Sequence, residues 1–485
     1  MKIITNRLIT LIVLMTLVLA LPCSAAGNQA QAAQRMHPLL QQMAAEQPDQ
    51  MVQVIVQKTD ASDQAEAAVA RAGGEILMGL DIIHAFVARI PAGAAREISA
   101  QPSVRWISPD APMEEAQCSQ CINTANLASA YIKSIRADQT WNTTPYRQGA
   151  GIGVAVVDSG INWQTDLYTI MGQNRVIANV RFNTDYNQTT FDNFGHGSHI
   201  AGVVGGNGRT LNGKYIGVAP KSNIINVKVS NDDGSSTVSS VVAGLEWILK
   251  NRARYNIRVV NISLNSSVEE SYHTSPLTAA VEVLWFNNIV VVVSAGNNGT
   301  ETLYPPANDP FVITVGAVDD KGTASITDDE VASFSAHSSE NGLKKPDLVA
   351  PGRNIVSLMG NVNGVIPSAH PANKVDNTYF RMSGTSVAAP MVSGAAALLL
   401  EDEPNLTADQ VKYRLMATAN TSWNGYNANK AGAGYLDVFA AVTGSTDKSA
   451  NTNVEASQLL WTGSQPVCWD SVAWNSVAWN SDYWE

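Results

Sequence analysis

The chain has 485 residues, of which 45% are hydrophobic and 15% are charged, and its formal net charge is −11. This length and composition can bury a large core and allow about two to four domains. The negative net charge argues against a nucleic-acid-binding protein, which needs a basic surface. Composition therefore favours a soluble globular protein.

The first 26 residues have the pattern of a secretory signal peptide. Lys2 and Arg7 precede an apolar run over 8–21, and Ser-Ala-Ala at 24–26 supplies the small residues of a cleavage site. A membrane anchor is the alternative, but the run is too short to span a bilayer, and no later stretch approaches the ~20 apolar residues of a span. The sequence therefore predicts a secreted protein whose signal peptide covers 1–26.

Residues 27–115 are predicted to form a small separate α+β domain. The pattern indicates strand, helix, two strands, helix and strand, a β-α-β-β-α-β order typical of a ferredoxin-like fold. The segments are Met51–Val56, Ser62–Ala72, two runs within Glu75–Ile90, Ala92–Ala100 and Val104–Ser108. By itself such a fold is as typical of a ligand-binding module as of any other function.

Cys118 and Cys121 follow this domain with two residues between them. In a cytosolic protein this spacing suggests metal or redox chemistry, but a zinc site needs a second ligand pair, and the remaining mature cysteine is Cys468 alone. In an oxidising compartment a structural disulfide is favoured. The sequence leaves open which of the three cysteines is unpaired.

From Gly151 onward the pattern becomes α/β. The continuous apolar run Gly153–Val157 predicts a strand buried on both faces, and it ends at Asp158. A carboxylate there must find a hydrogen-bonding partner or shift its pKa. Asp158 is therefore a candidate orienting acid, although a lone Asp at a strand end is more often a turn residue.

Two histidines, His196 and His199, stand in a glycine-rich stretch that precedes small and apolar residues. The glycines at 195 and 197 allow close backbone approach, and the following residues suit a tightly packed helix. The pair could bind a metal, but no further ligand stands at a familiar zinc spacing. We therefore predict His196 as a general base and His199 as a hydrogen-bonded core histidine.

Ser386 is the candidate nucleophile. It precedes a helix-like run rich in Ala, Val and Leu, and Pro390 requires that helix to begin only a few residues earlier. The free N–H groups and dipole at a helix start favour a developing oxyanion. An N-cap serine before a core helix is the simpler alternative, so the chemical interpretation depends on partners elsewhere in the chain.

The chain order Asp158, His196, Ser386 is that of the subtilisin-type triad. With the motifs VAVVDSG, GHGSHIAG and GTSVAAP, the sequence resembles the subtilisin-like serine peptidases, or subtilases, over about 131–441. The resemblance implies a three-layer α/β/α fold with a mostly parallel sheet in a catalytic domain at 116–445. It also departs from the family at Ser198, where Thr is usual, and at Val387, where Met is common.

The resemblance further implies the oxyanion and substrate positions. Asn297 would supply the side-chain oxyanion donor beside the backbone N–H of Ser386. Asn265 stands where the family usually has Gly, and Leu303 stands where a small residue often forms the pocket floor, which predicts a shallow pocket. The implied substrate-binding residues are Gly234, Ser235, Ser263, Leu264, Asn265, Ala295, Gly296 and Leu303.

The resemblance assigns 27–115 as an inhibitor-type propeptide whose end, near 110–121, lies across the active site after self-cleavage. It implies polypeptide substrates, the propeptide as intramolecular inhibitor, a monomer, and no required cofactor. Calcium as a structural ion is common in the family, but 207–214 offers no dense carboxylate cluster. We therefore assign no metal ligand.

Residues 446–485 are predicted to be a linker followed by a Trp-rich tail. The tail repeats Ser-Val-Ala-Trp-Asn at 471–475 and 476–480, which is too short to form a repeat domain. It could add an edge strand to the enzyme or form a sticky patch for a cell envelope. The alternative for the whole chain is an inactive subtilase-fold binding scaffold.

Overall fold

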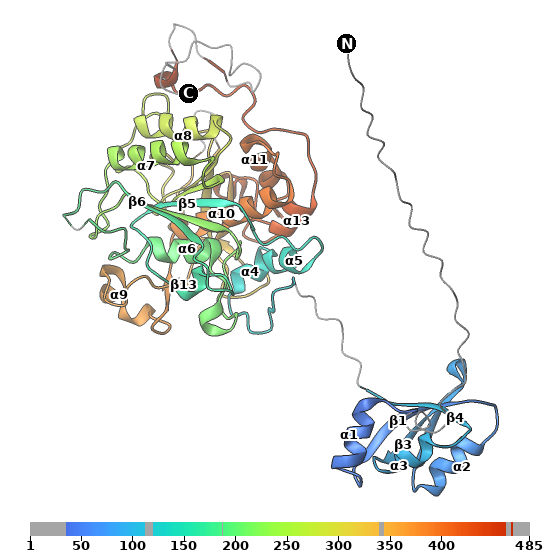
Figure 1. Cartoon of the computed structure of the whole chain (residues 1–485). Coiled ribbons are helices and arrows are strands. Elements are labelled where there is room, and N and C mark those ends of the chain that lie inside the picture. The colour runs from blue at the N-terminus through green and yellow to red at the C-terminus, as the bar shows by residue number, and fades with distance from the viewer. Residues whose placement is uncertain (1–34, 112–119, 187, 339–343, 462–466, 469–485) are drawn as a thin grey trace, which may run out of the picture. The chain divides into compact units, whose positions relative to one another are not determined.

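The computed structural model describes residues 35–111, 120–186, 188–338, 344–461 and 467–468. The chain divides into two compact units, Met1–Gln117 and Cys118–Glu485 (Figure 1). Each unit has its own hydrophobic core. Each is therefore described by itself.

The N-terminal unit has the predicted β-α-β-β-α-β order, preceded by an additional helix. Its antiparallel sheet has the strand order β2-β3-β1-β4. The additional helix starts with a proline, and its short length and mixed composition hid it from the sequence pattern. The elements are α1 (Pro38–Glu46), β1 (Met51–Lys58), α2 (Gln64–Arg71), β2 (Glu75–Leu80), η1 (Asp81–Ile83), β3 (Ala85–Pro91), α3 (Ala94–Ser99) and β4 (Val104–Pro109).

One face of this small sheet is covered and the other is open. Alternate strand residues such as Val54 and Val56 are fully buried in the core of the unit. Residues of the opposite face remain accessible: Met51 is 48%, Met78 57% and Trp106 38% exposed. The open face therefore exposes large apolar side chains among polar ones such as Gln53 and Arg89.

The C-terminal unit contains an eight-stranded sheet with the order β11-β10-β9-β8-β5-β7-β6, in which β12 also pairs with β10. All pairs are parallel except β10 with β11. The strands are β5 (Gly153–Asp158), β6 (Val176–Arg181), β7 (Asn223–Lys228), β8 (Ile257–Ile262), β9 (Val290–Ser294), β10 (Ile313–Asp319), β11 (Glu330–Val331) and β12 (Leu348–Pro351).

Helices cover both faces of this sheet, so the predicted three-layer α/β/α fold is confirmed (Figure 1). Helices α6 (Gly197–Gly205) and α10 (Thr385–Asp402) pack together on one face, and α7 (Val238–Asn251) and α8 (Pro276–Phe286) pack together on the other. Almost every residue of α10 from Thr385 to Leu400 is buried, which explains its lack of a polar face.

Shorter elements complete the unit. They are α4 (Ala130–Ser134), α5 (Ala137–Asn142), η2 (Thr165–Leu167), η3 (Arg209–Leu211), the antiparallel pair β13 (Ile355–Leu358) and β14 (Tyr379–Met382), α9 (Val365–Ala369), η5 (Pro371–Asn373), α11 (Ala408–Ala417), α12 (Ala428–Ala431), α13 (Val438–Thr443) and η6 (Gln458–Leu460). Among the described residues, no helix combines the length and apolar content that a membrane crossing requires.

Residues 446–461, the described start of the region 446–485 that is predicted to be linker and tail, pack against the unit. Ala456 and Leu460 are buried, and the side chain of Asn451 donates a hydrogen bond of 3.0 Å to the carbonyl oxygen of Phe311. The backbone N–H of Ser457 donates to a buried carboxylate of α8 at 2.7 Å. Buried apolar residues and hydrogen bonds from small polar ones therefore anchor this stretch. The Trp-rich repeat at 471–480 lies outside the described residues.

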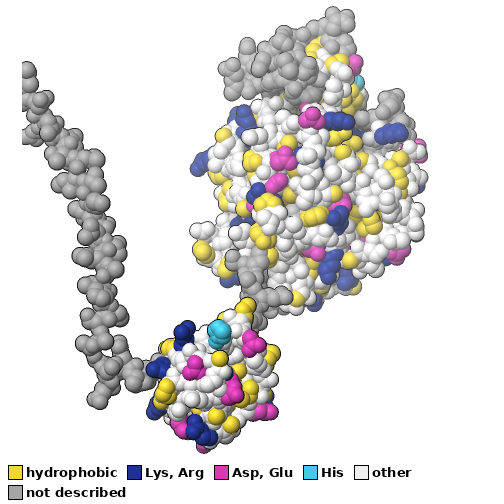
Figure 2. Space-filling model, turned by 90° about the vertical axis from the view of Figure 1, so that its right-hand side faces the viewer, with side chains coloured by type: hydrophobic (Ala, Val, Ile, Leu, Met, Phe, Trp, Pro, Cys, Tyr) yellow, Lys and Arg dark blue, Asp and Glu magenta, His cyan; other side chains and the backbone are white. Residues whose placement is uncertain are grey.

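The described cysteines differ in their bonding, and the charged side chains are dispersed over one face of the surface. Cys121 is disulfide-bonded, whereas Cys468 is free and exposed. Cys468 is therefore the unpaired cysteine that the sequence left open. Cys118 lies outside the described residues. On the face in Figure 2, Lys, Arg, Asp and Glu side chains are scattered among uncharged ones, without an extended basic stripe over the described residues.

Candidate active site

Asp158 and His196 form a hydrogen-bonded pair at the carboxyl end of the sheet. Asp158 ends β5 and is 1% exposed, and His196 directly precedes α6. Nδ1 of His196 lies 2.8 Å from Oδ1 and 2.9 Å from Oδ2 of Asp158. A carboxylate in this position favours a proton on Nδ1, so Nε2 keeps its lone pair. The imidazole can therefore accept a proton at Nε2.

The surroundings of His196 shift its pKa upward. Burial lowers this pKa, but the charge and hydrogen bond of Asp158, together with the charge of Asp192, outweigh burial and leave the pKa above the usual 6.5. For His199, burial and the neighbouring His196 lower the pKa to about 3. Its Nε2 lies 3.1 Å from the carbonyl oxygen of Ile355, so His199 is a buried, hydrogen-bonded core histidine, as predicted.

Asp192 is a buried residue of the site that sequence reasoning did not single out. Its Oδ1 accepts hydrogen bonds from the N–H of Gly195 at 2.7 Å and from Oγ of Ser159 at 2.8 Å, and its Oδ2 accepts one from the N–H of Ser198 at 2.8 Å. Two of these donors flank His196, so Asp192 fixes the loop that carries the imidazole. An acid four residues before a glycine-flanked histidine was the available signal.

Ser386 is the second residue of α10, as its predicted place at a helix start requires. In an α-helix its carbonyl would accept an N–H from the residue four positions on, but that residue is Pro390, which has none. Oγ of Ser263 donates to this carbonyl at 2.8 Å instead. Ser263, which the resemblance placed in a pocket wall, therefore fixes the backbone of the candidate nucleophile.

The side-chain amide of Asn297 is held in one orientation. Its Oδ1 accepts from the N–H of Thr385 at 2.8 Å and from Oγ1 of Thr385 at 3.0 Å, which leaves Nδ2 for another acceptor. Gly384 has φ 155°, and a Cβ there would lie 3.0 Å from Oγ of Ser386 and 3.2 Å from Nδ2 of Asn297. The hydroxyl and the amide therefore face the same space, which only a glycine at 384 leaves open.

The structure brings some predicted substrate-binding residues together and separates others. Gly234, Leu264 and Asn265 line one cavity of about 350 Å³, whose other lining residues include the aliphatic Val238 and Val241. The side chain of Asn265 bonds instead toward β9: its Nδ2 lies 3.0 Å from the carbonyl oxygen of Ser294. The departure from the usual glycine therefore ties the ends of β8 and β9 together.

The remaining predicted positions lie outside this cavity lining. Ala295 is buried, and its N–H donates to the carbonyl oxygen of Val315 at 3.0 Å. The N–H of Gly296 donates to Oγ1 of Thr385 at 3.0 Å, next to Asn297. Leu303 is 6% exposed within the core, and Ser235 accepts a backbone hydrogen bond from Asn231 at 2.7 Å.

No group of three or more His, Cys, Asp or Glu residues suited to a metal ion occurs in the described part of the chain. Oxygens do converge around Lys412, but the ammonium group of this lysine fills the space between them. Nζ of Lys412 lies 2.6 Å from the carbonyl oxygen of Pro310, 3.1 Å from those of Phe311 and Val312, and 3.2 Å from Oδ1 of Asp347. The ammonium group of Lys412 therefore occupies the position among these oxygens that a metal ion would take.

The sequence of this chain matches a known protein family and several of its members. The family model described as "Subtilase family" (peptidase S8) matches residues 149–436. Serine protease AprX of Bacillus subtilis is 39% identical over 337 residues, covering 67% of this chain and 72% of AprX. Subtilisin DY of Bacillus licheniformis is 33% identical over 314 residues, covering 64% of this chain and 97% of the relative.

A solved structure also shares the fold. Fervidolysin from Fervidobacterium pennivorans, described as a keratinolytic enzyme related to subtilisin, aligns with a TM-score of 0.52 at 24% identity, over 82% of this chain and 62% of that one. With the family match over more than half of the chain, the protein belongs to the subtilase family. It is a subtilisin-like serine-type endopeptidase, whose substrates are polypeptides.

Proposed function

We propose that the protein is an exported serine endopeptidase that works through Asp158, His196, Ser386 and Asn297. The observation that carries this proposal is the paired geometry. Asp158 fixes the imidazole through contacts of 2.8 and 2.9 Å, and the hydroxyl of Ser386 shares one open space with the amide of Asn297. Helices α6 and α10, which begin at the imidazole and the hydroxyl, pack against one another.

The reaction then follows from the groups present. Oγ of Ser386 attacks the peptide carbonyl while Nε2 of His196 takes its proton and later gives it to the leaving amine. Asp158 holds the imidazole and stabilises its protonated form. The developing oxyanion is stabilised by Nδ2 of Asn297 and the backbone N–H of Ser386. Water then attacks the acyl-enzyme, with His196 again taking and returning the proton, and this step releases the second product.

The substrate would lie in extended form along the edge segment that contains Gly234 and Ser235. The cavity beside this segment is lined by aliphatic side chains, including Val238, Val241 and Leu264, and suits an apolar substrate side chain. The buried Leu303 favours a shallow pocket for the residue before the scissile bond.

Cleavage profiling tests this expectation about specificity. On a peptide library, small residues should be preferred before the scissile bond, because Leu303 takes up the depth that a bulky side chain needs. Leu303→Ala should raise the relative kcat/KM for Phe and Tyr. If Phe and Tyr already dominate in the unaltered enzyme, the shallow-pocket proposal fails.

Labelling of Ser386 separates an enzyme from an inactive scaffold. A serine-directed phosphonate should add to the protein, with the mass increase located at Ser386 by peptide mapping, because the neutral imidazole of His196 activates that hydroxyl alone. Ser386→Ala and His196→Ala should abolish the adduct. A folded wild-type protein that stays unlabelled would favour the scaffold.

Export and synthesis as a zymogen complete the proposal. The segment 1–26 lies outside the described residues, but a disulfide at Cys121 fits an oxidising compartment. The N-terminal unit has the order expected of an inhibitor-type propeptide, and the exposed Met51, Met78 and Trp106 on the open face of its sheet would serve as docking residues. A large parallel sheet has many non-local contacts, so a folding template would lower its barrier.

A further inference from the structure

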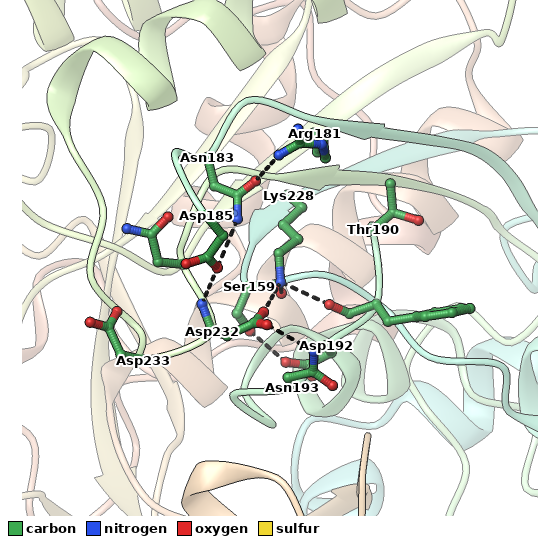
Figure 3. A network of polar contacts seen from close by, with 12 residues as sticks. Ser159, Arg181, Asn183, Asp185, Thr190, Asp192, Asn193, Lys228, Asp232 and Asp233 are labelled. Atoms are coloured by element: carbon green, nitrogen blue, oxygen red, sulfur yellow. Dashed lines mark hydrogen bonds and ion pairs between the residues drawn. The ribbon is translucent and has the colours of Figure 1, made fainter. Parts of the chain in front are cut away.

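A buried lysine, Lys228, lies among polar groups from three segments of the chain (Figure 3). Lys228 ends β7, stands opposite Asp158 of β5 in the sheet register, and is fully buried. An ammonium group has three donors, and leaving one unpaired in the interior is costly. The partners of Lys228 therefore define what the side chain holds in place.

Lys228 directs its three hydrogen bonds to three different segments. Nζ lies 2.9 Å from the carbonyl oxygen of Ser159, the residue after the candidate orienting acid. It lies 2.8 Å from the carbonyl oxygen of Phe191, in the loop that leads to His196. The third partner is Oδ1 of Asp232 at 2.7 Å, directly before the segment that contains Gly234 and Ser235 and is predicted to pair with the substrate.

Asp232 carries this connection further. Its Oδ2 accepts a hydrogen bond of 2.9 Å from Nδ2 of Asn193, so one carboxylate bridges the buried ammonium and the loop before His196. Two residues on, the α-carbon of Gly234 packs against the ring of Phe194 so closely that a Cβ has no room. The edge segment and the residue before it therefore contact the loop before His196 twice, through the carboxylate of Asp232 and through the ring of Phe194.

We propose that Lys228 and Asp232 are positioning residues, which couple occupation of the edge segment by a peptide to alignment of the Asp158–His196 pair. This rests on the proposed peptidase function. A long peptide that pairs with the edge would hold the loop of Asp232 still, and the link would pass that binding energy to the catalytic loops. A small substrate that does not reach the edge would not use the link.

The test compares short and long substrates. For p-nitroanilides of one and of four residues, the length gain is the ratio of kcat/KM for the long substrate to that for the short one. In Asp232→Asn we expect this gain to fall about tenfold, mainly through kcat. The rate at which a small phosphonate labels Ser386 should stay within about twofold, because that reagent does not reach the edge.

The chain offers a matched control. Glu246 and Lys250 on α7 form an ion pair with the same four-residue spacing, but their side chains are 60% and 69% exposed, whereas that of Lys228 is 0% exposed. Glu246→Gln and Lys250→Met should leave the length gain unchanged. Lys228→Met should lower the gain like Asp232→Asn, and the double variant should lose no more than either single one.

Two results would overturn the inference. One is an unchanged length gain in Asp232→Asn, whose partly exposed side chain tolerates the change even if Lys228→Met fails to fold. The other is an equal loss toward both substrates and the phosphonate, which would reduce the link to a structural one. A wild-type protein that cleaves neither substrate and takes up no phosphonate instead overturns the proposed function.

Discussion

At the scale of single residues, the imidazole of His196 lies beside two buried acids. Asp158 bonds to it directly, and Asp192 fixes the backbone on both sides of it. The neighbouring His199 lies on α6, which begins directly after His196, and stays neutral because burial lowers its pKa to about 3. The balance leaves the pKa of His196 raised.

This balance predicts the acidic limb of the pH profile. His196 must be neutral to take the proton from Ser386, and its pKa lies above 6.5, so kcat/KM should fall as the pH drops through a value above 6.5. Asp192→Asn removes one charge that raises this pKa, and the midpoint should move to lower pH. Measuring kcat/KM from pH 5 to 9 checks both points.

A suitable control is Glu246→Gln, which removes an exposed charge on α7 and should leave the midpoint in place. A flat profile between pH 5 and 8 in the wild type would contradict the role of His196. An unmoved midpoint in Asp192→Asn would show that its carboxylate acts only on the loop geometry.

Sequence reasoning at this scale depended on how local the signal was. Asp158, His196 and Ser386 stand in short motifs whose neighbours are themselves diagnostic, so they could be named in advance. Asp192 was passed over although its spacing before His196 offered a local signal. Lys228 could not be named, because two of its partners are backbone carbonyl oxygens of other segments. Ser263 was assigned to a pocket wall, since nothing local shows that Pro390 leaves the carbonyl of Ser386 without its helical partner.

At the scale of elements, α8 carries a buried acid that faces another. Glu282 of α8 and Asp309 of the loop before β10 are both fully buried, and Oε1 of the first and Oδ2 of the second have no hydrogen-bond donor among the described residues. Burial and the charge of Asp309 raise the pKa of Glu282 well above its usual value, and burial raises that of Asp309 to about 6. The pair therefore favours holding a proton.

This pair predicts a loss of stability as the pH rises. Because the folded state binds the proton more tightly than the unfolded one, stability should decline from about pH 4 upward through the raised pKa values. Glu282→Gln removes the penalty and supplies an amide donor toward Asp309. Its Tm should exceed that of the parent at pH 8, by about 2–4 °C for each kcal/mol gained, and approach it at pH 5.

The comparison is best made by thermal unfolding in a Ser386→Ala background, which prevents self-digestion. Glu246→Gln again serves as the control, because its carboxylate is exposed and its loss should leave the pH dependence unchanged. If the Tm of Glu282→Gln and that of the parent depend on pH in the same way, burial does not raise the pKa values of the two carboxyl groups.

Elements with a clear period or a continuous apolar run could be predicted, and others could not. The strands Gly153–Asp158 and Val290–Ser294 are buried on both faces and appear as unbroken apolar runs. Helix α8 is almost entirely buried, so it has no polar stripe to reveal its period. The 446–461 stretch appears linker-like because its small polar residues find partners only in tertiary structure.

At the scale of the whole molecule, the two compact units divide the proposed work. The N-terminal unit would help the parallel sheet to fold and then block the active site, and the C-terminal unit would carry the chemistry. The division between them falls at Gln117–Cys118, close to the predicted cut near 110–121. An intramolecular cut there requires the nucleophile of the same chain.

Self-processing can be tested with the inactive chain. Ser386→Ala should stay full-length when made in a protease-deficient host, whereas the wild type should lose the N-terminal unit, as intact mass would show. Adding a trace of mature wild-type enzyme should trim the variant, which proves that the bond is accessible. Maturation of Ser386→Ala on its own would refute self-processing.

The ammonium of Lys412 has a consequence for the medium in which the protein works. It bonds to the carbonyl oxygens of three consecutive residues and to Asp347, as a bound ion would, yet it is part of the chain. The stabilisation from a dissociable ion grows with the concentration of that ion and vanishes on dilution. A covalently attached cation has no such dependence, so this corner of the fold is held equally well in ion-rich and ion-poor surroundings.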